Sequence, residues 1–283
     1  VSACHYVRLV KGSHIVVPRL YDPLFASLLK PADRRIVFAI PYERDFTLIG
    51  TTDVEYMGDP AAVRITTEEI GYLCAAVSRY FARPVLPEQA VWSYSGVRPL
   101  LDDAAANPAS VTRDYALELD RHPAPLLSVF GGKITTYRKL AESAVDMLAR
   151  ELGSPARAWT ARALLPGGDL PRGAYAGFLR SLERTHPWLP PTLRYRYAHA
   201  YGTRVAHILH GAKSLADLGE ELLPQLYERE AEYLCDVELA QTAEDILWRR
   251  TRLGLRVGNG GAGRLQAWLA RRGSVRPEPA GGA

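Results

Sequence analysis

The chain has 283 residues, of which 47% are hydrophobic and 23% charged, and its 35 lysines and arginines against 31 aspartates and glutamates leave a net charge of +4. This composition is typical of a globular protein with one large or two ordinary domains, and the scattered basic residues argue against a nucleic-acid-binding protein. The three cysteines are far apart in the sequence, which argues against a disulfide framework or a zinc site and favours a reducing cytoplasm. No apolar run approaches the roughly 20 residues that a membrane-spanning helix needs.

The first half of the chain is predicted to consist mainly of strands. Residues 42–45 separate two of the strand segments and are predicted to form a hairpin loop. A helix is predicted at 66–81, where Thr66 or Thr67 can cap the N-terminus and apolar residues recur at helical spacing. The strand segments, rich in Val, Ile, Tyr and Phe, are "SHIVVP", "RIVFAIP", "FTLIGTTDVEY", "AVWSYSGVRPLL", "VTRDYALELD" and "LLSVFGG".

The stretch "LLSVFGGKITTYRKLAESAVDMLARELG", residues 126–153, is predicted to be a strand, a glycine turn and an amphipathic helix. Gly131 and Gly132 would let the backbone approach a ligand closely, and a helix that starts at Thr135 or Thr136 offers free N–H groups to an electron-rich partner. A tight connection without a ligand explains the same pattern equally well. The helix is expected to bury one face, formed by Leu140, Ala144, Met147 and Leu148.

After the helix the composition changes. Residues 154–172 are rich in proline and glycine and are predicted to link a first domain, 1–153, to a helical domain, 173–272. Helices are predicted near 173–186, 192–210, 224–239, 243–252 and 263–272, and the tail 273–283 is expected to be disordered. The run "GNGGAG" at 258–263 matches G-x-G-x-x-G in form, but no βαβ unit surrounds it, so we interpret it as a loop between helices.

Four residues at the ends of strand segments have side chains suited to a small phosphorylated alcohol. Arginine binds phosphate and carboxylate through two parallel hydrogen bonds, and histidine exchanges a proton near neutral pH. Taken singly, each is more simply explained as a surface charge or a hydrogen-bonded core histidine, and only convergence in space would make them a site. The four are His14, Arg98, Arg113 and Lys133.

Long motifs in this chain resemble the FAD-dependent, respiratory glycerol-3-phosphate dehydrogenases. They are "RLVKGSHIVVPR", "RIVFAIPYERDFTLIGTTDVEY", "WSYSGVRPLLDD", "TRDYALELD", "LLSVFGGKITTYRKLAE", "LPGGDLPRG" and "LWRRTRLGL". The resemblance implies an α+β fold: an antiparallel substrate-binding sheet and the remainder of an FAD-binding domain of the D-amino-acid-oxidase or glutathione-reductase type, followed by an all-α C-terminal cap domain.

The resemblance also implies an activity, the oxidation of sn-glycerol 3-phosphate to dihydroxyacetone phosphate, with hydride passing to FAD and electrons to membrane quinone. His14 would be the base for the C2 hydroxyl, and Arg98 and Arg113 would hold phosphate and substrate oxygens. Lys133, Gly131 and Gly132 would approach the flavin, with Thr135 or Thr136 and the helix start stabilising negative charge on the reduced ring. A homodimer, and a cytoplasmic location at an anionic inner membrane face, are further expectations.

The sequence departs from this family because the N-terminal dinucleotide-binding segment, with its strand, G-x-G-x-x-G turn and helix, does not precede Val1. We therefore expect a C-terminal fragment that binds FAD poorly and is inactive alone. Two alternatives stay open: an oxidase that passes electrons to oxygen, and a non-catalytic fragment that acts as an interaction module. No metal ligand set is predicted.

Overall fold

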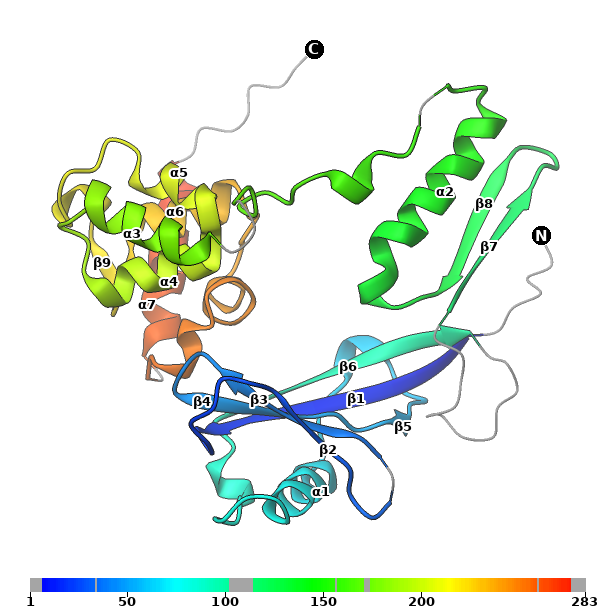
Figure 1. Ribbon diagram of the computed structural model, residues 1–283, viewed down its shortest axis with the longest axis horizontal. Coiled ribbons are helices and arrows are strands. Elements are labelled where there is room, and N and C mark those ends of the chain that lie inside the picture. Colours follow the sequence, from blue (N-terminus) through cyan, green and yellow to red (C-terminus); the bar gives the residue numbers. More distant parts are fainter. Residues whose placement is uncertain are drawn as a thin grey trace. The chain divides into compact units, whose positions relative to one another are not determined.

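The computed structural model describes residues 7–33, 35–101, 114–155, 157–170, 174–258 and 260–275. The chain forms two compact units, residues 1–162 and 163–283 (Figure 1). The first contains most of the strands together with helices α1 and α2, and the second contains the remaining helices and one short antiparallel strand pair. Among the described residues no helix has both the length and the apolarity needed to cross a bilayer.

The first unit is built on a six-stranded antiparallel sheet. Its long central strand β1, Val7–Pro18, pairs with β6, Trp92–Leu101, along one edge and with β4, Phe46–Gly50, and β5, Val54–Glu55, along the other. The sheet continues outward through β3, Val37–Tyr42, to β2, Ser27–Leu29, which the sequence analysis missed because a strand of three residues carries no periodicity. The predicted hairpin loop is confirmed: Tyr42 pairs with Phe46, and Glu43 and Arg44 between them have positive φ.

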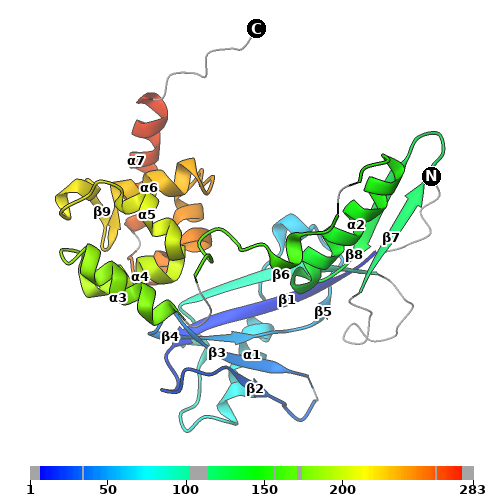
Figure 2. The ribbon, with the colours of Figure 1, turned by 45° about the horizontal axis from the view of Figure 1, so that its top comes forward.

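Helix α1, Thr67–Ser78, covers one face of this sheet. Thr66 caps it, as predicted, in a reciprocal capping box with Glu69. Leu73 and Val77 are fully buried against sheet residues such as Ile15, and each such side chain contributes about 1.5 to 3 kcal/mol to folding. Figures 1 and 2 show α1 on one side of the sheet and α2 on the other.

A separate hairpin of β7, Tyr115–Asp120, and β8, Leu126–Gly131, leads into the 3-10 turn Ile134–Thr136 and then α2, Tyr137–Glu151. The predicted strand, turn and helix are therefore present. The expected burial of the apolar face is not: Leu140, Ala144 and Met147 are only half-buried and Leu148 is 37% exposed. Within this chain α2 packs on the hairpin, which is too narrow to cover that face.

The second unit is mainly helical. Its core includes the fully buried Leu193, Ile208, Leu234 and Ile246. The helix predicted at 192–210 divides at Gly202, whose φ is +52°, and a small antiparallel pair, β9 and β10, replaces part of the expected all-α pattern. The "GNGGAG" run is not a loop throughout, because α7 begins at Gly261. The helices and strands of this second unit are α3 Tyr175–Thr185, α4 Pro191–Tyr201, α5 Val205–Leu209, β9 Glu221–Leu223, β10 Leu226–Tyr227, α6 Glu228–Asp236, the π-helical segment Asp245–Arg250 and α7 Gly261–Val275.

Candidate functional site

The two faces of β1 serve different purposes because successive side chains of a strand point to opposite sides. Lys11, Ser13 and Ile15 point toward α1. Gly12 and His14 belong to the other face, where Gly12 lies beside Arg98 and His14 lies beside Gly50. The candidate site lies on this second face.

His14 is held by its neighbours on both edges of β1. Its imidazole stacks on Tyr94 of β6, with ring centroids 4.9 Å apart and planes inclined by 8°. On the β4 side it lies across Gly50, where an added Cβ would be only 2.1 Å from the ring. Burial, and secondarily the positive charge of Arg98, lower the pKa of His14 from 6.5 to about 4. The side chain is therefore neutral at physiological pH, as a proton acceptor must be.

Arg98 is fixed by three features of the sheet. Its Nη1 donates to Asp53 Oδ1 at 2.8 Å and its Nη2 donates to Thr51 Oγ1 at 3.1 Å. The guanidinium lies across Gly12, where an added Cβ would be 2.4 to 2.7 Å from Nη1, Nη2 and Cζ. A side chain at position 12 would thus occupy the space that Arg98 uses.

The face toward α1 carries a buried polar network that supports this arrangement. Glu69 accepts hydrogen bonds from the hydroxyls of Ser13 and Thr52, at 3.0 and 2.9 Å, and pairs with Lys11 at 2.8 Å. Thr52 Oγ1 in turn accepts from the Ser13 backbone N–H at 3.0 Å. The network joins α1, β1 and the segment that carries Thr51 and Asp53, so a buried charge is satisfied and the segment is anchored.

The turn after β8 has the features expected of a ligand-facing helix start. Gly131 and Gly132 have φ of +67° and +98°, a conformation that other residues rarely adopt. Lys133 and Thr135 are exposed, and no side chain caps the first turn; the Thr136 hydroxyl donates to the Lys133 carbonyl oxygen instead. An uncapped helix start fits an electron-rich group such as the redox end of a flavin. No strand, G-x-G-x-x-G turn and helix for a dinucleotide's other half occurs in the part of the chain that the structure describes.

The structure brings together two of the four predicted cationic or titratable residues. His14 and Arg98 lie on one face of the β1–β6 pair, four register positions apart, because His14 pairs with Tyr94 and Arg98 pairs with Val10. Arg113 lies outside the described residues. Lys133 belongs to the turn that begins at Gly131. Gly131 lies beside Leu101, the last residue of the strand that carries Arg98, because a Cβ added at Gly131 would be 3.5 Å from the Leu101 nitrogen. The local sequence does not single out Thr51, Asp53, Tyr94, Gly12 and Gly50, because only the strand register places them beside His14 and Arg98.

The helical unit contains a different kind of polar site. Arg196 and Glu230 form a buried ion pair, to which the Tyr201 hydroxyl also donates. Burial opposes the charge on Arg196, but the adjacent Glu230 carboxylate raises its pKa above the ordinary value. Every partner belongs to the same unit, so we interpret this cluster as structural.

A cavity of about 450 Å³ in the helical unit is lined by segment 164–167 with Asp169, Thr203, Arg204 and His207, and contains none of the predicted site residues. In the described part of the chain no group of three or more His, Cys, Asp and Glu side chains is placed to hold a metal ion.

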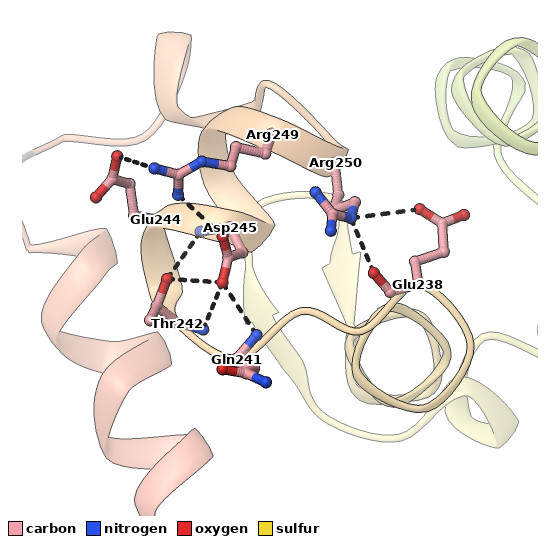
Figure 3. Close-up of polar contacts among 7 residues, drawn as sticks. All are labelled: Glu238, Gln241, Thr242, Glu244, Asp245, Arg249 and Arg250. Atoms are coloured by element: carbon pink, nitrogen blue, oxygen red, sulfur yellow. Dashed lines mark hydrogen bonds and ion pairs between the residues drawn. The ribbon is translucent and has the colours of Figure 1, made fainter. Parts of the chain in front are cut away.

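The basic motif "LWRRTRLGL" does not present an unpaired cluster (Figure 3). Arg249 pairs with Glu244 and Asp245, both at distances under 3 Å, and Arg250 donates to the Glu238 carbonyl oxygen at 3.1 Å. Asp245 also accepts from the backbone N–H groups of Gln241 and Thr242, which holds the chain that leads into the segment. These arginines therefore fix the π-helical segment to its surroundings.

Two family models match the chain. Residues 3–138 match the model described as FAD dependent oxidoreductase. Residues 158–269 match the model described as the C-terminal domain of alpha-glycerophosphate oxidase. Together the two matches cover most of the chain.

Individual relatives agree with these models. A glycerol-3-phosphate dehydrogenase of Pseudomonas aeruginosa is 51% identical over 251 residues, which are 88% of this chain and 49% of the relative. A D-erythritol 1-phosphate dehydrogenase of Brucella abortus is 46% identical over 247 residues, which are 87% and 49% of the two chains. The solved structure of the glycerol-3-phosphate dehydrogenase from Bacillus halodurans, complexed with FAD, matches with a TM-score of 0.79 at 31% identity, over 97% of this chain and 54% of that one. The chain thus spans about half the length of the curated relatives it matches.

Proposed function

Because residues 3–138 match the model described as FAD dependent oxidoreductase, we propose that this chain supplies the substrate-binding sheet and helical domain of an enzyme that oxidises sn-glycerol 3-phosphate to dihydroxyacetone phosphate. The observation that carries the proposal is the pairing of a neutral histidine with a fixed arginine on one face of an antiparallel sheet. The glycerol-3-phosphate dehydrogenases among its relatives support the choice of substrate.

In the proposed reaction His14 takes the proton of the C2 hydroxyl, which its neutral state at physiological pH allows. Arg98, with Arg113 as a second arginine, holds the anionic phosphate and the substrate oxygens. FAD, when bound, accepts the hydride that leaves C2. Stacking on Tyr94 keeps the imidazole in one orientation relative to the substrate hydroxyl.

The residues proposed to face the redox end of FAD are those of the turn after β8. Gly131 and Gly132 give close backbone access, and Lys133, Thr135 and Thr136 with the uncapped helix start favour negative charge on the reduced ring. The residues that bind the rest of the dinucleotide belong, in this proposal, to the half of the relatives' length that this chain does not cover.

The electron acceptor, location and assembly are further parts of the proposal. We assign membrane quinone as the acceptor, with a homodimer at the cytoplasmic side of an anionic membrane. A respiratory dehydrogenase of this kind must meet its quinone at the membrane surface, so peripheral attachment accords with the activity. An oxidase that uses oxygen is the alternative, favoured by the match of residues 158–269 to a domain of alpha-glycerophosphate oxidase.

A second substrate is favoured by one specific relative. The 46% identity with a D-erythritol 1-phosphate dehydrogenase extends over 87% of this chain, so a four-carbon polyol phosphate is a candidate beside the three-carbon one. Both substrates carry a phosphate for an arginine and a secondary hydroxyl for a base, and the two differ by one hydroxymethylene group.

The test is a hybrid polypeptide in which this chain is joined to the part of the Pseudomonas aeruginosa relative that it does not cover. We expect the hybrid to hold flavin, and anaerobic sn-glycerol 3-phosphate to bleach its visible band and to reduce a soluble quinone. The matched control carries His14→Asn, which should hold flavin and bleach at least a hundredfold more slowly, as expected when a general base is lost.

The other results of the same assay discriminate between the alternatives. Bleaching only by D-erythritol 1-phosphate would overturn the choice of substrate. Oxygen consumption without added quinone would assign the oxidase. A hybrid that holds flavin but is reduced by neither sn-glycerol 3-phosphate nor D-erythritol 1-phosphate would refute the proposed enzymatic function and favour the interaction module.

A further inference from the structure

We propose that Asp53 and Thr51 are positioning residues that hold the Arg98 guanidinium in the one orientation that accepts the substrate's anionic group. This inference rests on the proposed function for the identity of the substrate. It assigns to the "GTTD" segment, residues 50–53, a role that its strand-like sequence does not indicate.

The hydrogen bonds define the orientation of the guanidinium in its plane. Nη1 donates a hydrogen bond to Asp53 Oδ1 and Nη2 donates one to Thr51 Oγ1, so each terminal nitrogen has one fixed partner. An arginine side chain has five N–H donors, and three remain for other acceptors. The guanidinium also lies over Gly12, in the space that a Cβ at this position would occupy, so the backbone of Gly12 limits its movement out of the plane. The two hydrogen bonds and this contact together favour one rotamer of Arg98.

The partners are themselves anchored. Along residues 51–53 successive side chains point to opposite faces, so Thr51 and Asp53 meet Arg98 while Thr52 meets the network on the α1 side. Thr52 donates to Glu69 and accepts from the Ser13 backbone N–H. The segment is therefore pinned at its middle residue, and its two outer side chains form a rigid clamp on the opposite face.

The clamp lowers the cost of binding. A long, charged side chain that is free in solution must be ordered when a ligand binds, and this ordering weakens binding by about one power of ten per side chain. Arg98 is already ordered by its hydrogen bonds to Asp53 and Thr51. Losing the clamp should therefore weaken ground-state binding of the anion and leave the chemical step, carried by His14, largely unchanged.

The experiment uses the hybrid polypeptide with Asp53→Asn, Asp53→Ala and the charge-retaining Asp53→Glu. The matched control is Asp22→Asn, which removes another aspartate paired with an arginine, Arg19, at a fully exposed position of the same unit. We expect KM for sn-glycerol 3-phosphate to rise about tenfold in Asp53→Ala with kcat within about twofold, an intermediate change in Asp53→Asn, and partial recovery in Asp53→Glu. Asp22→Asn should leave both constants unchanged.

A second measurement separates this inference from the proposed function. Inorganic phosphate binding, followed by calorimetry on the same flavin-loaded variants, needs no turnover and should weaken about tenfold in Asp53→Ala. If no substrate is oxidised but phosphate binding still depends on Asp53, the function fails and the clamp stands. If phosphate binds the wild type and Asp53→Ala equally well, or if kcat falls while KM is unchanged, the clamp is overturned. A variant that does not fold is replaced by Thr51→Val, which removes only the Nη2 acceptor.

Discussion

At the scale of single residues, the candidate site depends on two glycines as much as on its charged side chains. The imidazole of His14 and the guanidinium of Arg98 occupy the space in which a Cβ of Gly50 and of Gly12 would lie. Neither glycine has a positive φ, so the requirement is one of space and not of backbone conformation. A small residue on each neighbouring position lets two large polar groups lie flat on the sheet.

The first prediction concerns the protonation of His14. Burial and the nearby Arg98 lower its pKa from 6.5 to about 4, so the acid limb of the kcat/KM profile of the hybrid should lie near pH 4. An unperturbed histidine would place that limb near pH 6.5, and finding it there would contradict the buried, arginine-flanked geometry. Because the unfolded chain takes up this proton near pH 6.5 and the folded chain only near pH 4, folding stability should also decline as pH falls through that window.

At the scale of elements, α1 is the part of the fold that holds the site strands in place. Its capping residue Glu69 also accepts hydrogen bonds from β1 and from Thr52, so one carboxylate serves the helix terminus and the sheet. Helix α2, in contrast, begins without a side-chain cap and has no fully buried residue within this chain. The difference matches their positions: α1 is packed on the sheet, whereas the start of α2 is the proposed flavin-facing surface.

The second prediction concerns the Glu69 network. Glu69→Ala leaves Lys11 buried without its counter-charge, and should lower the free energy of unfolding by about 3 to 5 kcal/mol. Lys139→Ala, which removes an exposed ion pair with Glu142, is the control and should change it by less than about 1 kcal/mol. Urea unfolding followed by tryptophan fluorescence measures both, and equal values for the two variants would refute a structural role for the network.

The pH dependence of this network has a defined sign. Burial alone would raise the pKa of Glu69, but the hydrogen bonds from Lys11, Thr66, Thr52 and Ser13 outweigh it and the pKa lies below its ordinary value of 4.5. The stability that Glu69 contributes is therefore complete above pH 4.5 and is lost as the pH falls further. Glu69→Gln should be less sensitive to acid over that range than the wild type.

At the scale of the whole molecule, the predicted family resemblance and α+β fold class are confirmed, and the matching Bacillus halodurans structure is complexed with FAD. The chain spans about half the length of its curated relatives, and the apolar face of α2 is incompletely covered within it. In the proposed function, the site residues of this chain contact the substrate and the redox end of the flavin. Pyrophosphate binding in dinucleotide folds relies on a strand, a G-x-G-x-x-G turn and a helix, a unit that the described residues do not contain.

The third prediction follows from this division. The purified chain, mixed with FAD and then freed of excess, should be colourless, because the pyrophosphate cradle supplies much of the affinity for a dinucleotide. Its absorption spectrum measures this directly, with the hybrid polypeptide as the positive control. A retained flavin band that sn-glycerol 3-phosphate bleaches would show that this chain assembles a working redox site by itself, contrary to our expectation.

The sequence alone determined the features that depend on local pattern. Alternation and helical spacing located most strands, α1 with its Thr66 cap and α2, and long motifs identified the family. The same reasoning selected His14 and Arg98, because a motif retains the residue type that the chemistry needs. It could not tell a ligand-facing turn from a plain connection at Gly131 and Gly132, and three-residue β2 carried too little pattern to be found.

Only the tertiary structure decided which residues face one another. Asp53 and Thr51 lie 45 and 47 positions from Arg98 in the chain, and they meet it because β4, β5 and β6 flank β1 in one register. A shift of that register by one residue would turn each of these side chains to the opposite face. Strand pairing across such distances is a property of the packed sheet and not of any local segment, so the clamp on Arg98 and the space above Gly12 and Gly50 exist only in the folded chain.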